Sequence, residues 1–75
     1  MKIDKKIKKI EIKVNGKVKS VTEKTSLLEL ANNLKIPLKK VAIELNQEIV
    51  DKKKINKISL KKNDKIEIVH FIGGG

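Results

Sequence analysis

Few side chains in this sequence could carry out chemistry, and they do not form a recognisable catalytic set. The chain has no cysteine and one histidine, His70. It therefore has no thiolate nucleophile, and a single histidine cannot supply a multi-histidine metal cluster. The serines have local structural explanations, and the glutamates at polar positions of expected strands offset lysine charge rather than form an acid–base pair. We therefore expect that the protein is not an enzyme acting alone.

The C-terminus offers a different kind of chemistry. Gly73, Gly74 and Gly75 directly follow an apolar run at residues 65–72. Without Cβ atoms, three glycines form a narrow segment that reaches ~10 Å when extended. The terminal carboxylate, with a pKa near ~3.5, is anionic at neutral pH and a poor electrophile. Such a tail suits insertion into a partner's active site, where adenylation could activate the carboxylate; the alternative is an end without function.

The charge of the chain favours acidic partners, but its residue composition argues against nucleic acid. Nineteen lysines and no arginine stand against 9 acidic residues, which gives a formal net charge of +10. Arginine is the residue that reads guanine edges, and a single phenylalanine gives no platform for base stacking. The lysines either reflect a compositional bias or steer the chain towards acidic partners. No apolar run approaches the ~20 residues of a membrane span or forms a signal peptide, so we expect a cytoplasmic protein.

The first half of the chain predicts a β-hairpin and a helix. Residues 10–14 alternate apolar and polar side chains, Asn15-Gly16 is typical of a type I′ turn, and residues 17–22 return as the second strand. The basic stretch 1–9 is interpreted as a mobile arm. A helix is predicted at 26–35, because leucines recur there at helical spacing behind a capping box formed by Ser26 and Glu29.

The second half predicts further strands that must share a core with this helix. The expected elements are a strand at 41–45, a very short strand at 48–50, a loop or short helical turn at 51–60 and a strand at 65–72. We therefore predict an α+β fold, with a mixed sheet of four to five strands and one helix packed across it. The first and last strands should lie side by side and parallel.

The last expected strand and the glycine tail together resemble the C-terminus of a known protein family. The segment DKIEIVHFIGGG (64–75) closely resembles the C-terminus of the thiamine-biosynthesis sulfur carrier family, ThiS. Other segments agree with that family in order and spacing: IEIKVNGK (10–17), TSLLELANNLKI (25–36) and VAIELNQEIVDK (41–52). The resemblance covers residues 10–75 and implies a ubiquitin-like β-grasp domain at 10–72 with a flexible glycine tail at 73–75.

The sequence departs from the family pattern mainly at turns. Gln47 and Asn63 stand where glycine is frequent, and Asp51-Lys52 replaces a common Pro-Arg. Asparagine tolerates positive φ, whereas glutamine does so less well. We therefore expect the turn at Asn46-Gln47 to differ in type from a glycine-containing turn.

The resemblance also implies a reaction sequence at the tail. A partner adenylyltransferase would use ATP to form an acyl-adenylate on the Gly75 carboxylate. Sulfur from a cysteine desulfurase would displace AMP, and the resulting thiocarboxylate would donate sulfur to thiazole synthase. The carrier itself would bind no cofactor and no metal, and would act as a protein cosubstrate whose Gly73 and Gly74 thread the partner's active site.

A docking surface and several rival functions follow from the same residues. Strand alternation places Ala42, Val69 and Phe71 on the sheet face away from the helix, where they could form an apolar docking patch, unless the segment 51–60 covers them. The nearest rival functions are the small subunit of molybdopterin synthase and a carrier for tRNA thiolation or protein conjugation. A more distant rival is a basic β-grasp module that binds RNA.

Overall fold

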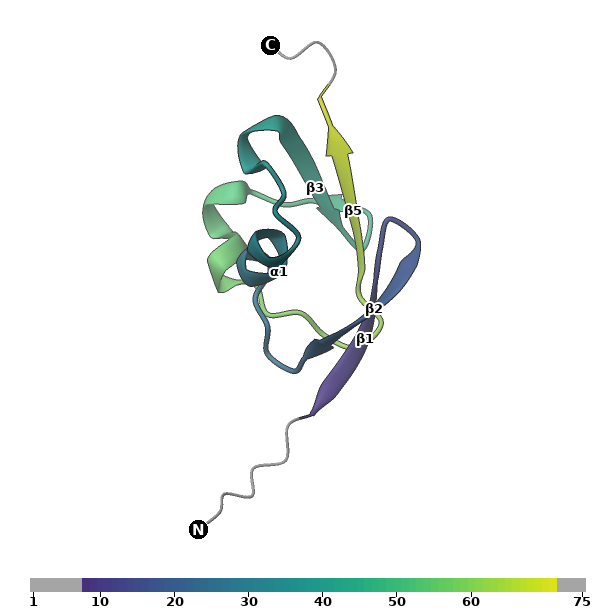
Figure 1. Ribbon diagram of the computed structural model, residues 1–75. Coiled ribbons are helices and arrows are strands. Elements are labelled where there is room, and N and C mark those ends of the chain that lie inside the picture. Colours follow the sequence, from purple (N-terminus) through teal and green to yellow (C-terminus); the bar gives the residue numbers. More distant parts are fainter. Residues whose placement is uncertain (1–7, 72–75) are drawn as a thin grey trace.

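The computed structural model describes residues 8–71, which form one five-stranded mixed sheet with a helix on one face (Figure 1). The strand order is β2-β1-β5-β3-β4. Residues 1–7, most of the predicted arm, lie outside the described residues, as do all three glycines of the tail. The elements in chain order are β1 (Lys9–Val14), β2 (Lys17–Thr22), α1 (Leu27–Asn33), η1 (Leu38–Lys40), β3 (Val41–Leu45), β4 (Glu48–Ile49), η2 (Lys52–Lys57) and β5 (Lys65–His70).

The first hairpin forms as its sequence predicts. β1 and β2 pair antiparallel over their full lengths, from Lys9 opposite Thr22 to Val14 opposite Lys17. The turn between them has positive φ at both central positions, 50° at Asn15 and 84° at Gly16. Such a turn matches the twist of the flanking strands, and asparagine and glycine are the residues that adopt it at least cost.

The helix begins at a capping box and ends earlier than predicted. The Ser26 hydroxyl accepts a hydrogen bond from the Glu29 amide at 3.0 Å, and the Glu29 carboxylate accepts one from the Ser26 amide at 2.9 Å. Leu34 is the C-cap and Lys35 has a φ of 57°, so the helix stops before residue 35. Two consecutive weak helix formers, at 32 and 33, leave little propensity to extend it further.

The core lies between α1 and the sheet. It includes buried side chains from β1, α1, β3, η2, the segment after η2, and β5, with relative exposures of 8% or less: Ile12, Val14, Leu27, Leu30, Val41, Ile43, Ile55, Leu60 and Ile66. The segment 51–60 is a 3₁₀ helix with an extended end, anchored by Ile55 and Leu60 as its sparse apolar residues predict. Within residues 8–71 no helix has the length and apolarity needed to cross a membrane.

β5 occupies the centre of the sheet and joins its two halves. It pairs parallel with β1, where Val14 lies opposite Ile66, and antiparallel with β3, where Val41 lies opposite His70. The predicted parallel contact between the first and last strands is therefore confirmed. The chain passes from β2 through α1 to β3 and leaves a gap between β1 and β3 in the sheet. The last strand, β5, fills this gap (Figure 1).

The turn at Asn46-Gln47 corrects one expectation. We expected it to differ from a glycine-containing turn, yet φ is positive at both positions, 52° at Asn46 and 75° at Gln47. The physical reason is an anchor outside the turn. The Asn46 side chain accepts a hydrogen bond from the Lys65 amide at 2.9 Å and donates one to Asp64 at 3.0 Å. These bonds fix the turn against the start of β5, and Gln47 follows into the left-handed region.

Candidate functional site

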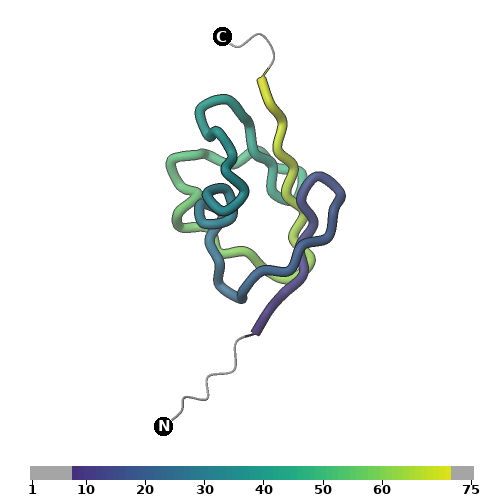
Figure 2. The backbone as a smooth tube through the Cα atoms, in the orientation of Figure 1, coloured from purple at the N-terminus to yellow at the C-terminus, as the bar shows by residue number. Residues whose placement is uncertain are grey.

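The last strand positions the point from which the glycine tail departs. β5 is paired with β3 up to His70, and the Phe71 amide donates to the Lys40 carbonyl at 2.9 Å. The pairing thus continues one residue beyond the strand. Figure 2 shows the described end of β5 at one extremity of the molecule. The predicted modification site, Gly75, and the threading residues Gly73 and Gly74 follow it and lie outside the described residues.

The residues of the predicted docking patch lie together on the sheet face away from α1. Ala42 is directly opposite Val69 in the register of β3 and β5, and Ile66, which alternates with Val69 along β5, is buried. Val69 and Phe71 are 51% and 55% exposed, and Ala42 is half-buried. The segment 51–60 therefore leaves both larger side chains accessible, although the Lys52 ammonium lies 5.4 Å from the centroid of the Phe71 ring.

The same face carries two further exposed apolar side chains that the sequence alone did not indicate. Val18 lies opposite the outward-facing Lys13, and Ile49 lies opposite Glu44. They are 59% and 72% exposed. Only the strand register shows which face these two side chains occupy. β2 and β4 have too few buried positions for their sequences to indicate which residues face the core. The open face of the sheet, defined here by Val18, Ala42, Ile49, Val69 and Phe71, is thus partly apolar from edge to edge.

Pairs of like charge interrupt the open face. Lys13 lies beside Lys65 where β1 meets β5, and Glu44 lies directly opposite Glu67 where β3 meets β5. Like charges directly opposite each other on a sheet destabilise it. The face therefore presents a basic band next to an acidic one, and both border the apolar residues.

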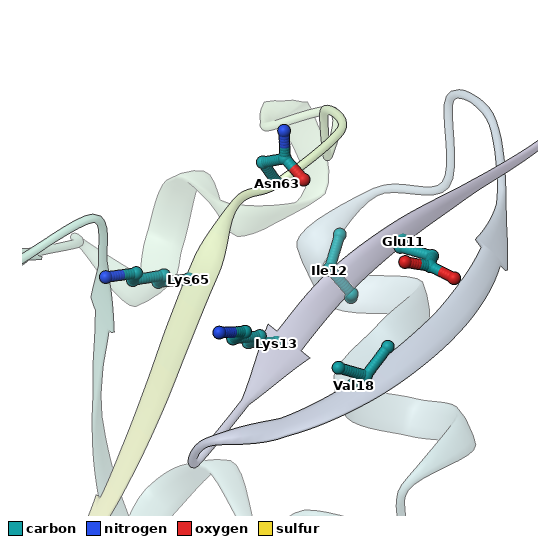
Figure 3. A pocket seen from close by; sticks show the side chains of 6 residues that line it. All are labelled: Glu11, Ile12, Lys13, Val18, Asn63 and Lys65. Carbon is teal, nitrogen blue, oxygen red and sulfur yellow. The ribbon is translucent and has the colours of Figure 1, made fainter.

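A shallow hollow lies beside the basic band, at the end of β5 remote from Phe71. Its volume is about 220 Å³. The Lys13 and Lys65 ammonium groups are directed the same way there (Figure 3). Its lining combines charged and amide groups with apolar surface, without a nucleophile beside a base: Glu11, Ile12, Lys13, Val18, Asn63 and Lys65. We assign no catalytic role to it.

The side chains that could be considered catalytic are dispersed or structurally occupied. The Ser26 hydroxyl caps α1, and Ser59 forms an isolated bridge with Ser26. His70 is exposed at the end of β5 opposite Val41. Among residues 8–71, no group of three or more histidine, aspartate or glutamate side chains is placed to hold a metal ion.

Two residues that support β5 and the turn at its end were missed by the sequence analysis. The Asn15 side chain accepts a hydrogen bond from the Ile68 amide at 2.7 Å, which continues the support of β5 beyond the end of β1. The Lys52 ammonium donates to the carbonyls of Leu38 and Val41, each at 2.6 Å. Asn15 looked like a turn residue only, and Lys52 carries no signal that separates it from the other lysines.

Comparison with known proteins gives a consistent result. A sequence model of the ThiS family matches residues 12–75. The chain is 37% identical over 65 residues to sulfur carrier protein ThiS of Bacillus subtilis, covering 85% of this chain and 98% of that protein. It is 35% identical over 66 residues to a thiazole synthase of Paramagnetospirillum magneticum, covering 88% of this chain and 20% of that protein. The chain thus spans about a fifth of the length of the thiazole synthases that it matches.

A solved structure confirms the fold. The crystal structure of thiamine biosynthesis protein ThiS from Geobacter metallireducens superposes with a TM-score of 0.77 at 32% identity. It covers 88% of this chain and 100% of that one. The predicted β-grasp architecture, with a mixed sheet and one helix, is therefore confirmed.

Proposed function

The chain belongs to the ThiS family, and on that premise we propose that it is a sulfur carrier protein in thiamine biosynthesis. The observation that carries the proposal is the match over residues 12–75, which extends through all three glycines of the tail. A relative named as a sulfur carrier is matched over nearly its whole length. The product formed on such a carrier would be a C-terminal thiocarboxylate at Gly75.

The proposed chemistry takes place in the active sites of partners. The Gly75 carboxylate attacks the α-phosphorus of ATP, pyrophosphate leaves, and an acyl-adenylate forms on the partner adenylyltransferase. The terminal sulfur of a persulfide that originates from a cysteine desulfurase then displaces AMP and forms an acyl disulfide. A partner thiol cleaves this acyl disulfide and becomes a disulfide itself, so the carboxylate oxygen is replaced by sulfur. The chain supplies a narrow tail and a docking surface, and its own side chains take no part in bond making. It needs no bound cofactor for this role, since ATP is used by the partner.

Thiazole synthase is the acceptor that we propose for the sulfur. Proteins named thiazole synthase contain a segment similar to nearly all of this chain. Joining two proteins in one chain raises their effective concentration towards each other, which is useful when they react together. This similarity favours the thiamine pathway over the other carrier roles, in molybdopterin synthesis, tRNA thiolation and protein conjugation.

The open face of the sheet is the proposed docking surface. Val69 and Phe71 are more than half exposed next to the base of the tail, and Ala42 lies beside them. An apolar patch in this position lets a partner bind the domain while the tail enters its active site. The many lysines would steer the carrier towards acidic partner surfaces.

Intact mass spectrometry tests the proposal. The chain is incubated with an adenylyltransferase, ATP and a sulfur source, and a chain that lacks Gly74 and Gly75 serves as the control. We expect a mass gain of one sulfur minus one oxygen, located at Gly75 and dependent on ATP. An unchanged mass, with an adenylyltransferase that is active on its own carrier, would contradict the proposal. A salt-sensitive RNA affinity that survives removal of the two glycines would instead favour the RNA-binding alternative.

A further inference from the structure

We propose that Lys52 is a positioning residue that fixes the end of β5 and so sets where the tail begins. The inference rests on the proposed function, because this position matters only if the tail must enter a partner's active site. It assigns a role to one lysine out of the 19 in the chain. The assignment comes from three contacts made by a single ammonium group.

The first two contacts fix the turn that precedes β3. Lys52 is the first residue of η2, and its ammonium donates to the carbonyls of Leu38 and Val41, each at 2.6 Å. Leu38 begins η1 and Val41 begins β3, so these two bonds bridge the whole of η1. The Lys52 side chain is half-buried, whereas its neighbours Lys53 and Lys54 are exposed. Hydrogen bonds from a charged donor are stronger than neutral ones, which makes this an effective clamp.

The same turn holds the last described residue of the chain. The Lys40 carbonyl, which lies between the two carbonyls held by Lys52, accepts the hydrogen bond from the Phe71 amide at 2.9 Å. The Lys52 ammonium also lies 5.4 Å from the centroid of the Phe71 ring, within the range of a cation–π contact. Lys52 therefore acts on Phe71 twice, directly at the ring and indirectly through the backbone of η1.

The position of Phe71 matters because the glycines have no conformational preference of their own. One residue separates Phe71 from Gly73, and glycine populates both signs of φ about equally. When a partner's active site holds the tail extended, the position of Phe71 therefore sets where the tail begins and how far its end reaches. Four extended residues span roughly 14 Å, so a small tilt at Phe71 displaces the terminal carboxylate by several ångströms. When Phe71 is not held in place, binding to a partner must also order it, which weakens binding and raises KM without changing the chemical step that follows.

The test compares Lys52→Met, Lys52→Arg and the matched control Lys53→Met, which removes an exposed lysine from the same 3₁₀ helix. Amide hydrogen exchange is measured at Phe71 and, as an internal reference, at the core residue Ile43. The KM and kcat of each chain are measured as substrate of the adenylyltransferase. We expect Lys52→Met to raise the exchange rate at Phe71 and the KM by at least about tenfold each, because it removes two charge-assisted hydrogen bonds and a cation–π contact.

The remaining expectations separate positioning from simple stabilisation. In Lys52→Met, exchange at Ile43 and kcat should stay close to wild type, Lys52→Arg should restore most of the KM, and Lys53→Met should match wild type throughout. Unchanged KM and Phe71 exchange in a folded Lys52→Met chain would overturn the proposal, and so would faster exchange at Ile43 equal to that at Phe71. A wild-type chain that is not adenylated would overturn the proposed function instead, and the exchange at Phe71 would still decide whether Lys52 fixes the end of β5.

Discussion

Asn15 and Asn46 perform the same two tasks on opposite sides of β5. Each occupies the first central position of a two-residue turn with positive φ, and each accepts a hydrogen bond from a β5 amide with its side chain. Asn15 supports Ile68 and Asn46 supports Lys65. These two residues therefore couple the shape of the hairpins to the position of the strand that leads to the tail.

Gln47 bears a backbone strain that glycine would relieve. Its φ of 75° lies in the left-handed region, which costs a side-chain-bearing residue roughly 1–2 kcal/mol. Gln47→Gly removes this strain, but glycine also loses more conformational entropy on folding, which offsets part of the effect. We therefore expect the free energy of unfolding to rise by about 0.5–1 kcal/mol. Chemical denaturation measures the change. Glu48→Gly, one residue on in extended β4, is the control and should not stabilise; equal effects in both variants would refute the strain argument.

A substitution at Gly74 tests directly whether the tail must thread a narrow active site. Gly74→Val adds bulk and restricts φ in the tail without touching the described fold. We expect an unchanged melting temperature and a fall in the adenylation rate of at least roughly a hundredfold, by the sensitivity of active sites to placement. Gly74→Ala should fall between this variant and wild type. A normal rate of thiocarboxylate formation in Gly74→Val would show that no narrow channel receives the tail.

At the scale of elements, the helix depends on its cap. Ser26→Ala removes the hydroxyl that accepts from the Glu29 amide, and α1 has only 7 residues over which to compensate. We expect a loss of about 1 kcal/mol in the free energy of unfolding, the typical cost of losing an N-cap. Ser20→Ala in the exposed strand β2 is the matched control and should change stability by less than about 0.5 kcal/mol. A loss no greater than the control's would mean that Glu29 alone maintains the start of the helix.

The open face of the sheet should contribute to binding more than to stability. Because Phe71 is 55% exposed, Phe71→Ala should cost less than about 1.5 kcal/mol of stability, well under the cost of truncating a buried phenylalanine. Binding to the adenylyltransferase should weaken at least tenfold if Phe71 is a docking anchor. Calorimetry and thermal denaturation measure the two effects. Val18→Ala, on the same face but at the far edge of the sheet, is the comparison variant for both measurements. Equal binding by wild type and Phe71→Ala would exclude the patch as the docking site.

The sequence predicted the first hairpin and the start of the helix because the interactions that form them are local. The capping box, the Asn15-Gly16 turn and the alternation in β1 each depend on residues within a few positions of one another. The turn at Asn46-Gln47 was wrongly expected to differ, because its anchor, Asp64 and Lys65, lies 18 and 19 residues away in sequence. The role of Lys52 was not predictable for the same reason: its partners belong to η1 and β3.

At the scale of the whole molecule, the arrangement separates a covered face from an open one. One face of the sheet packs against α1, and β5 emerges from its centre towards the tail. The parallel contact of first and last strands was predictable, since one helical crossover joins the two halves. The apolar residues at both edges of the open face were not, because Val18 and Ile49 acquire a common face only through pairing with neighbouring strands.

The net charge of the molecule predicts the kinetics of association. With a formal charge of +10, the carrier should be drawn to an acidic partner by long-range attraction. We expect the association rate with the adenylyltransferase to fall about tenfold or more between low and high salt, with a smaller change in the dissociation rate. Stopped-flow measurements over a salt series test this. An association rate independent of ionic strength would show that the lysines reflect composition rather than steering.

The most direct test of the account follows a sulfur atom from this chain to its acceptor. The chain is converted to the thiocarboxylate with a heavy isotope of sulfur, purified, and mixed with thiazole synthase and its remaining substrates for a single turnover. The account predicts that the label appears in the thiazole product while the chain returns to the mass of its carboxylate form. Label that stays on the chain in the presence of an active thiazole synthase, or that is transferred only to a molybdopterin or tRNA acceptor, would contradict it.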